Sequence, residues 1–581
     1  MPVNRRRVLK VLTAAGVTAP VVARSWKASA AGGAVDITPD MIRQAEWLTG
    51  LRYDDADRDL MLEDVRDAVK QWDELRGVEI DNSVVPAFTF DPAPGRDIPA
   101  GGGATWAALP DSGKRASAER GTDSDVAFAS IAQLATWLER GEISARELTD
   151  LYLARLERFD PQLACVITTT AERAREFAEE ADRRLAAGER IGALDGIPWG
   201  AKDLLAVSGY RTTWGAKPYE NQTREETAAV VQRLDDAGAV LLAKLSVGAL
   251  AWGDVWFGGT TKNPWNPEQG SSGSSAGPAS ATAAGLVGFA IGTETWGSIL
   301  SPSTRCGLTG LRPTFGTVSR HGCMALTWTM DKIGPMARSA EDCAWIFDAI
   351  RGRDPRDPAS RDSAFSWPSG KRAERLRVGF IPSLFEEERP QDDEEAPSPQ
   401  AVAAAREWDA IDRRTLKELE GMGIDLIPME LPTDVPVGPL ALILTAEATA
   451  AFDDLTRSGR DDLLVRQERY AWPNVFRRGQ LIPAVEYIRA NRIRTHLVAA
   501  WERMFEKVDV FVAPTYGGDN LLATNLTGHP QLVLPNGFRE SDGTPTSITF
   551  TGRLFGEEDL LAIGAAYQQA TDYHRKRPAG F

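Results

Sequence analysis

Two short stretches of the sequence hold residue types that can build a serine nucleophile and its base. The first is the block Gly270-Ser-Ser-Gly-Ser-Ser-Ala-Gly277, which passes into a run of small residues and then an apolar segment. The second surrounds Lys202 in Gly196-Ile-Pro-Trp-Gly-Ala-Lys202-Asp203, where small and apolar neighbours are unusual company for a lysine. A flexible linker would not be followed at once by an apolar helix and strand, so we expect the glycines to bring backbone close to a ligand.

Ser298 lies in the turn from Thr293 to Ile299, directly after an expected strand, Val287 to Gly292. The backbone N–H groups of Thr295 to Ser298 can converge there as an oxyanion hole. A serine needs a base to become a nucleophile, and with only four histidines in the chain a histidine-based mechanism is short of residues. Lys202 is the better candidate, because burial can lower the pKa of a lysine by several units from about 10.4.

The order of these segments resembles the amidase signature family over roughly residues 126–578. The family's serine block, followed after about two dozen residues by G-T-[DE]-x-G-G-S-[IL], is similar to Ser272–Gly277 and Gly292–Ile299. The resemblance implies a Ser-cisSer-Lys triad in which Ser298 is the nucleophile, Ser274 the cis-serine that relays protons, and Lys202 the base. It also implies that the oxyanion and the substrate are bound near Thr295, Trp296, Gly297, Ser275 and Gly273.

The sequence departs from the family pattern at several positions. Ser272 and Ala276 replace glycines of the serine block, Trp296 stands where a small residue is common, and Leu300 stands where arginine is frequent. Trp296 and Leu300 are expected to border the cleft, so the substrate that it accepts can differ from those of the family. Four further tryptophans lie in or between the motifs, and for each alone core packing is the expected role and an aromatic pocket the alternative: Trp199, Trp214, Trp252 and Trp256.

A different catalytic arrangement also fits part of the sequence. Gly273 to Gly277 satisfies G-x-S-x-G, the nucleophile elbow of α/β-hydrolases, with Ser275 as the nucleophile and His529 as its base. That elbow requires a strand directly before it. The preceding residues, Asn263-Pro-Trp-Asn-Pro-Glu-Gln-Gly270, contain two prolines and cannot form a central strand. We therefore favour the lysine mechanism and interpret His529 as a structural turn residue.

Apolar segments alternate with helical stretches along most of the chain, which favours an α/β sheet covered by helices on both faces. The resemblance implies an α/β/α sandwich with a large mixed, mostly parallel twisted sheet. Helix starts are indicated by Ser130 and by the capping-box pattern Ser144-x-x-Glu147. The expected strands are Val240–Lys244, Val287–Gly292, Arg377–Ile381, Ile424–Met429 and Val508–Ala513; the expected helices include Ala171–Ala187, Ala279–Gly285 and Val402–Leu419.

The chain is expected to have three parts. Residues 1–30 contain paired arginines and a lysine, Asn4-Arg-Arg-Arg-Val-Leu-Lys10, then a mildly apolar stretch and Ala28-Ser-Ala30, which resembles a twin-arginine export signal with its cleavage site. Residues 31–125 are interpreted as a helical extension, in which residues 36–80 are expected to be helical, and a linker. Residues 126–581 form the catalytic domain, in which 386–400 is a solvated acidic insertion loop. Export implies a periplasmic or extracellular location.

The composition limits the classes of partner and cofactor that we expect for this protein. The 581 residues include 66 basic and 82 acidic ones, a net charge of −16, and no basic block, which argues against nucleic acid or an anionic membrane as the main partner. The four cysteines contain no CxxC pair, so we expect no zinc site, and the mechanism needs no metal or organic cofactor. A small-molecule or peptide-like amide is the expected partner, and a homodimer is one option for the assembly.

The sequence therefore predicts a secreted serine amidohydrolase that cleaves carboxamide C–N bonds through an acyl-enzyme on Ser298. Three alternatives stay open. One is the A subunit of a glutamyl- or aspartyl-tRNA amidotransferase, which the export signal and the acidic charge oppose. The second is an esterase or aryl-acylamidase, since the same triad cleaves esters. The third is a secreted binding protein whose cleft is blocked by Trp296.

Overall fold

The structure is a computed structural model, and it describes residues 37–49, 51–76, 81–84, 88–93, 120–386 and 399–581. It divides into two compact units, Met1–Asp81 and Asn82–Phe581. The expected export signal at residues 1–30, most of the expected linker and most of the acidic insertion lie outside the described residues. The second unit begins at Asn82, earlier than the expected start of the catalytic domain at residue 126.

Within the described residues, the first unit contains two helices, α3 (Pro39–Thr49) and α4 (Asp55–Arg76), in the stretch 36–80 that the sequence predicted to be helical. The two helices are joined by the buried ion pair of Glu46 on α3 and Arg58 on α4, whose atoms Oε1 and Nε are 2.7 Å apart. Leu62, Val65 and Val69 lie on α4, so the apolar spacing did locate a helix.

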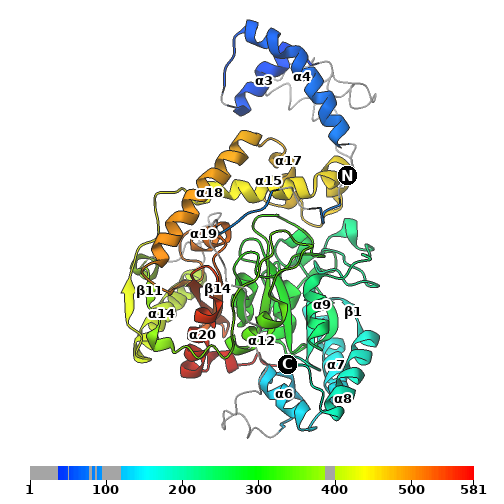
Figure 1. Cartoon of the computed structure of the whole chain (residues 1–581), viewed down its shortest axis with the longest axis vertical. Helices are drawn as coiled ribbons and strands as arrows, with labels where there is room; N and C mark the ends of the chain where they lie inside the picture. Colours follow the sequence, from blue (N-terminus) through cyan, green and yellow to red (C-terminus); the bar gives the residue numbers. More distant parts are fainter. Residues whose placement is uncertain (1–36, 50, 77–80, 85–87, 94–119, 387–398) are drawn as a thin grey trace. The chain divides into compact units, whose positions relative to one another are not determined.

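The second unit is built on a mixed sheet, which has eleven strands within the described residues (Figure 1). Its strand order is β1-β3-β2-β8-β10-β9-β14-β15-β13-β11-β12. The strands are β1 (Val166–Thr169), β2 (Pro198–Lys202), β3 (Val240–Leu245), β8 (Phe289–Glu294), β9 (Thr309–Arg312), β10 (Lys332–Ala337), β11 (Val378–Phe380), β12 (Leu426–Pro428), β13 (Val510–Pro514), β14 (Gln531–Phe538) and β15 (Pro545–Gly552). Short hairpins outside it pair β4 (Val255–Trp256) with β5 (Gly259–Thr260) and β6 (Lys262–Asn263) with β7 (Asn266–Gly270).

The expected α/β fold with a large mixed sheet is confirmed, and its parallel pairs fall into two groups. β2 runs parallel to both β3 and β8, and β11 runs parallel to both β12 and β13. The strands between these groups, and β1 at one edge, pair antiparallel, so the description "mostly parallel" holds for the two groups and not for the middle of the sheet. One reason is local: only residues 539–544 join β14 to β15, too few for the crossover that a parallel pair needs.

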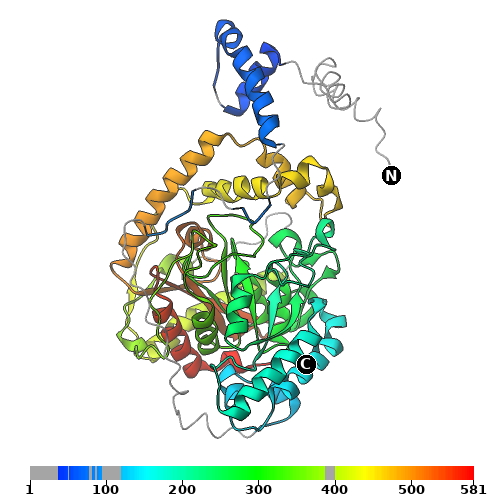
Figure 2. The same ribbon diagram turned by 45° about the vertical axis from the view of Figure 1, so that its right-hand side comes forward.

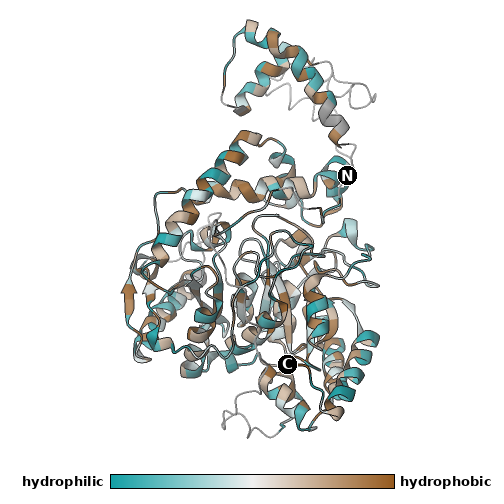
Figure 3. Ribbon diagram, viewed as in Figure 1, coloured by the Kyte–Doolittle hydropathy of each residue, from teal (hydrophilic) through white to brown (hydrophobic). Residues whose placement is uncertain are grey.

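Helices cover both faces of the sheet. On β14, Val533 packs in a cluster with residues of α10 (Ala276–Ala283) and α11 (Leu300–Cys306), whereas Leu532 and Leu534 pack in a cluster with residues of α20 (Glu557–Thr571). Because successive strand residues point to opposite faces, α10 and α11 lie on the face opposite to α20. Figure 2 shows the central strands enclosed by helices, and Figure 3 shows hydrophilic residues on the turns of α8 (Ala171–Ala187), which buries Ala174, Ala178 and Ala181.

Most expected elements are present. All five expected strands are confirmed, with end shifts of one or two residues. Ser130 and Ser144 cap α6 (Ile131–Glu139) and α7 (Ala145–Leu163) through complete capping boxes. The remaining α-helices are α5 (Asp123–Ala127), α9 (Ala229–Asp236), α12 (Ala340–Ile350), α13 (Pro382–Glu386), α14 (Pro399–Gly421), α15 (Leu442–Ala451), α16 (Asp453–Arg457), α17 (Trp472–Gly479), α18 (Ala484–Phe505) and α19 (Asn520–Thr527).

One group of helices was not expected from the sequence. Figures 1 and 2 show α15, α17 and α18 gathered beyond one end of the sheet strands. Leu444 and Thr445 of α15 and Trp472, Val475 and Arg478 of α17 contribute to one wall of the cleft described below. Within the described part of the chain, no helix combines the length and the apolar character needed to cross a membrane.

Candidate active site

Lys202 ends the central strand β2 and is completely buried. Its Nζ lies 2.8 Å from Ser274 Oγ, 3.0 Å from Ser275 Oγ, 2.8 Å from Thr293 Oγ1 and 3.2 Å from the Thr293 carbonyl oxygen. Burial lowers the pKa of Lys202 to about 7, with acidic groups such as Asp331 and Glu294 opposing the shift only partly. A substantial fraction of this amine is therefore neutral near pH 7.

Ser274 and Ser275 are brought to the lysine by the glycine-rich block before α10. The Gly273–Ser274 peptide bond is cis, as the resemblance implies. Gly273 has no room for a side chain, because a Cβ atom there would lie 1.9 Å from the Gly253 carbonyl oxygen. Ser275 stands at the start of α10, and its hydroxyl donates to the Thr293 carbonyl at 3.1 Å. The block therefore holds two hydroxyls against one amine.

Ser298 lies on the turn between β8 and α11 and lines a cleft with Gly273, Thr295 and Trp296. The N–H of Ser275 donates to the Ser298 carbonyl at 3.2 Å, which fixes the turn beside the serine block. No hydrogen bond joins the hydroxyls of Ser298 and Ser274 in the part of the chain that the structure describes. The predicted base and relay are thus in direct contact, and the predicted nucleophile is their neighbour at the cleft surface.

The backbone N–H groups of residues 295 to 298 are available for a ligand, because none of them donates to an acceptor within the described residues. Gly297 has a φ of +87°, and a Cβ atom there would lie 3.0 Å from Ser301 Oγ and 3.2 Å from Leu521 Cδ2. Glycine is suited to that left-handed conformation. Thr295, Trp296 and Gly297 therefore form a short loop whose unpaired donors can face an oxyanion.

Glu294 holds the backbone at the end of this turn, a role that the sequence did not indicate. Its Oε2 accepts the N–H groups of Ile299 and Leu300 at 2.8 and 3.0 Å, and its Oε1 accepts from Arg312 at 2.8 Å and Asn525 at 2.9 Å. Burial would raise the pKa of Glu294, but Arg312 and the other donors hold it below its usual range. The carboxylate therefore stays charged and fixes the backbone that carries Ser298.

The cleft in front of Ser298 has a volume of about 560 Å³ and combines aromatic and cationic side chains. Trp252, Trp296, Tyr470 and Trp472 contribute aromatic surface, and Trp296 is 47% exposed. The guanidinium groups of two exposed arginines, Arg305 and Arg478, also line it. The cleft is thus open to a substrate that is partly apolar.

Two expectations about side chains near the cleft differ from the structure: the one about Leu300 is wrong, and the four tryptophans do not share one role. Leu300 does not border the cleft; it is fully buried in an apolar cluster because the first turn of α11 points it into the core. Among the four tryptophans of the motifs, Trp199, Trp214 and Trp256 are buried as core residues. Trp252 lines the cleft and carries the guanidinium of Arg466 at 4.0 Å from its ring centroid.

His529 and Ser275 do not form a nucleophile elbow. The His529 ring is buried between Trp501 and Phe505, with ring centroids 5.5 and 5.0 Å away, and its Nδ1 lies 2.8 Å from Thr527 Oγ1. The strand before the serine block is β7, which belongs to a two-stranded hairpin and not to the central sheet. This agrees with the structural role expected for His529.

The comparisons with known proteins place the chain in a family. Residues 147–523, more than half of the chain, match the family described as Amidase. The chain belongs to this family, the amidase signature enzymes, and is thus a hydrolase that acts on amide C–N bonds. Within the described residues, no group of three or more histidine, cysteine, aspartate or glutamate side chains is arranged to hold a metal ion.

Similar proteins include both amidotransferase components and amidases. The A subunit of glutamyl-tRNA(Gln) amidotransferase from Roseiflexus castenholzii is 37% identical over 493 residues, 77% of this chain and 97% of that protein. Its counterpart from Methylococcus capsulatus is 35% identical over 491 residues, 78% and 98% of the two chains. The structure of native peptide amidase from Stenotrophomonas maltophilia aligns with a TM-score of 0.66 at 28% identity, covering 78% of this chain and 98% of that one.

Proposed function

We propose that the protein hydrolyses a carboxamide through an acyl-enzyme on Ser298, with Ser274 as proton relay and Lys202 as base. The observation that carries this proposal is the buried Lys202 amine, 2.8 Å from Ser274 Oγ and directly behind the cleft that Ser298 lines. Membership of the amidase family gives the reaction class. The small-molecule or peptide-like amide substrate is part of the proposal.

The proposed mechanism uses the contact between Lys202 and Ser274 and the position of Ser298 at the cleft. It requires the hydroxyls of Ser298 and Ser274 to come within hydrogen-bond distance when the substrate binds. Ser298 Oγ attacks the carbonyl carbon while its proton passes to Ser274 Oγ, and the Ser274 proton passes to neutral Lys202 Nζ. The tetrahedral oxyanion accepts hydrogen bonds from the N–H groups of the 295–298 turn. The relay then returns a proton to the leaving nitrogen, the C–N bond breaks, and an ester to Ser298 remains. Water attacks that ester by the same route and releases the carboxylic acid.

The first test is covalent labelling combined with a substrate panel. A fluorophosphonate probe should label wild-type protein at Ser298, and Ser298→Ala should abolish the label, whereas the exposed-site control Ser458→Ala should keep it. The panel compares peptide C-terminal amides, glutamine, anilides and matched esters. A wild-type protein that is neither labelled nor active on any of them would be the blocked binding protein; turnover of esters alone would indicate the esterase alternative.

A second candidate is the A subunit of a tRNA-dependent amidotransferase, in which the same half-reaction would release ammonia from a donor amide. The relatives named above support this candidate better than they support an exported, free-standing amidase. One feature of the cleft also favours it: Arg478 lines the cleft and forms no ion pair within the described residues. An unpaired guanidinium can bind the carboxylate of a free amino acid such as glutamine.

Two measurements distinguish the free-standing amidase from the amidotransferase subunit. If glutamine is the donor, Arg478→Ala should raise the KM for glutamine about tenfold or more while the KM for an uncharged amide changes little. An amidotransferase component should also co-purify with partner proteins and transfer ammonia to acylated tRNA. A protein that purifies alone, has no glutaminase activity and hydrolyses peptide amides would favour the free-standing amidase.

We also propose that residues 1–30 direct export by the twin-arginine route, on the strength of Arg5, Arg6, Lys10 and the Ala28-Ser-Ala30 site. Residues 1–30 fused to a reporter should carry it across the membrane of a bacterium that has this pathway. Replacing Arg5 and Arg6 together by lysine should retain the reporter in the cytoplasm. Equal export of the two fusions would contradict the twin-arginine route. Export of neither would contradict export itself and remove the main objection to the amidotransferase candidate.

A further inference from the structure

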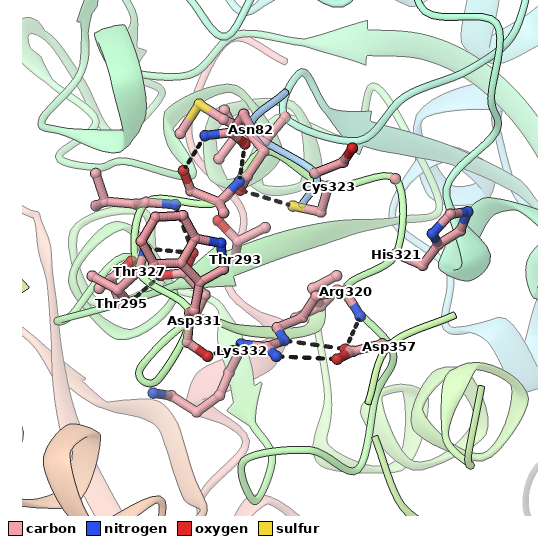
Figure 4. Close-up of a pocket in the computed structure, with 18 of the residues that line it drawn as sticks. Asn82, Thr293, Thr295, Arg320, His321, Cys323, Thr327, Asp331, Lys332 and Asp357 are labelled. Atoms are coloured by element: carbon pink, nitrogen blue, oxygen red, sulfur yellow. Dashed lines mark hydrogen bonds and ion pairs between the residues drawn. The ribbon is translucent and has the colours of Figure 1, made fainter. Parts of the chain in front are cut away.

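A loop from Arg320 to Asp331 lines a cavity of about 50 Å³ together with Thr295, the first residue of the turn 295–298, which is called the oxyanion turn below (Figure 4). Thr293 and Thr295 line this cavity from the catalytic side, and Asn82 lines it from the N-terminal part of the chain. Leu326 lines both this cavity and the cleft in front of Ser298. The loop therefore contributes to both spaces through Leu326.

Asp331 ties the loop to the oxyanion turn. Its Oδ1 accepts the Thr295 hydroxyl at 2.6 Å, and its Oδ2 accepts the backbone N–H groups of Leu326 and Thr327 at 2.8 and 3.0 Å. A single carboxylate thus joins residue 295, the first residue of the turn, to the middle of the loop. A shift of the loop would be passed directly to Thr295 through these bonds.

Asn82 holds the loop from the other side. Its Nδ2 donates to the Ala325 carbonyl at 2.9 Å, and the Ala325 N–H donates to its Oδ1 at 2.7 Å. This two-bond pairing joins residues 243 positions apart in the sequence. Ala325 directly precedes Leu326, so the side chain of Asn82 fixes the backbone whose next N–H group is bound by Asp331.

A second contact holds the far end of the same loop. The ring of Phe90 lies 3.5 Å from the guanidinium of Arg494 and 5.2 Å from the ring of Phe315. Arg494 donates to both the hydroxyl and the carbonyl oxygen of Thr329, each at 2.8 Å. Two residues that precede the family match thus contact the loop. Asn82 contacts Ala325 directly, and Phe90 acts on Thr329 through Arg494.

We propose that Asn82 is a positioning residue for the reaction: by pairing with Ala325 it holds the 320–331 loop so that Asp331 keeps Thr295 and the oxyanion turn in place. The N-terminal segment is then part of the active-site scaffold and not only a linker. This inference rests on the proposed amide hydrolysis. It predicts that loss of the Asn82 amide acts on the transition state more than on substrate binding, because the oxyanion donors are used only as charge develops.

The test compares Asn82→Ala with Asn82→Asp and with the control Val84→Ala, a neighbour whose side chain is 55% exposed. Steady-state kinetics on the best amide of the panel should give a kcat about tenfold lower for Asn82→Ala with KM within about twofold. Asn82→Asp, which keeps the acceptor for the Ala325 N–H, should fall between Asn82→Ala and wild type. Val84→Ala should match wild type.

A double-mutant cycle separates positioning from a general loss of structure. Thr295→Val removes the hydroxyl that Asp331 binds, and in that background Asn82→Ala should lower kcat less than about twofold further, since the route to the turn is already broken. Independent, multiplicative losses, or a kcat unchanged by Asn82→Ala, would overturn the proposal. A wild-type enzyme without amidase activity would instead contradict the proposed function, so the two failures are distinct.

Discussion

Lys202 differs from the other fully buried lysine nearby, Lys244, in what surrounds its amine. Lys244 Nζ lies 2.6 Å from the carboxylate of Asp203, a charge that keeps it in a structural ion pair. Lys202 contacts three hydroxyls and one carbonyl oxygen instead. Hydroxyls can donate or accept, so this environment satisfies both the neutral amine and the ammonium ion. An amine that changes charge without losing its partners is suited to act as a base.

The titration of Lys202 predicts the pH dependence of the enzyme. The base acts in its neutral form, and burial lowers its pKa to about 7. The value of kcat/KM in the free enzyme should therefore fall about tenfold per pH unit below 7 and level off above it. The measurement is a pH–rate profile from pH 5 to 9 with an uncharged amide; a flat profile across that range would contradict the assignment.

Removing the amine tests the same residue without relying on pH. Lys202→Ala should lower kcat/KM at least about 10³-fold at neutral pH, because neither Ser274 nor Ser275 can take up the proton alone. Lys217→Ala, a control at an exposed lysine outside the cleft, should have wild-type kinetics. The far-ultraviolet circular dichroism of both variants should match wild type. Substantial turnover by Lys202→Ala would refute the base assignment.

At the scale of elements, the turn between β8 and α11 depends on one buried ion pair. Glu294→Gln removes the charge that balances Arg312, and leaving that guanidinium uncompensated should cost about 3 kcal/mol of unfolding free energy. Because the pKa of Glu294 is lower in the folded protein than in the unfolded chain, its contribution is complete above the ordinary glutamate value, about 4.3. It is lost as the pH falls through the lower folded-state value.

Thermal denaturation of wild type and Glu294→Gln at several pH values checks this sign. The difference in Tm should be largest near neutral pH and should shrink as the pH falls below the ordinary glutamate pKa of about 4.3. Activity should fall as well, because the amide has one acceptor oxygen in place of two and cannot serve both Arg312 and the N–H groups of Ile299 and Leu300 beside Ser298. A difference in Tm that grows at low pH would mean that Glu294 is not stabilised in its charged form.

The serine block makes a second prediction at this scale. An alanine at Gly273 would place its Cβ against the Gly253 carbonyl oxygen, so the backbone next to Ser274 must shift. A displacement near 1 Å costs about 10²-fold in kcat when it separates reacting groups. Gly421→Ala is a matched control, because nothing lies within 4 Å of a Cβ atom there. Equal kcat for Gly273→Ala and wild type would show that the close packing does not position Ser274.

The sequence predicted the elements that carry apolar runs and missed those that do not. β3 is continuously apolar apart from Lys244, and it was located within one residue. Three strands contain a proline, which argues against a central strand in a sequence: Pro198 in β2, Pro335 in β10 and Pro535 in β14. The antiparallel middle of the sheet was missed for this reason, since β14 and β10 both lie within it.

The candidate site was predictable only where the residues lie inside a motif. Lys202, Ser274 and Ser298 were placed together from their motifs, and the structure brings Lys202 into contact with Ser274. Ser275, which was expected near the oxyanion or the substrate, contacts Lys202 as well. Thr293 was not singled out, although it stands five residues before Ser298, because a threonine at a strand end has no distinctive pattern. Asn82 could not be found, since its partner Ala325 is 243 residues away and neither residue type indicates a pairing.

At the scale of the whole molecule, the chain has two compact units that meet in sequence at Asp81 and Asn82. The first unit is held by contacts of its own, such as the pairing of Glu46 with Arg58 and the burial of Ile42. Catalytic, cleft and loop residues all belong to the second unit, and so do Asn82 and Phe90. The boundary of the catalytic unit thus lies well before the family match, which begins at residue 147.

This division predicts the outcome of two truncations. A chain that lacks residues 1–76 has lost both α3 and α4. It should keep kcat within about twofold of wild type, because the second unit is compact, has its own core and can fold alone. A chain that lacks residues 1–93 loses Asn82 and Phe90, and its kcat should fall about tenfold or more while KM changes little. The comparison is made by steady-state kinetics on one amide, with Tm measured on both chains. If the longer deletion were fully active, the contacts of Asn82 and Phe90 would have no part in positioning the oxyanion turn. If the shorter deletion were already inactive, the first unit would be needed for catalysis, and the active enzyme would depend on both units.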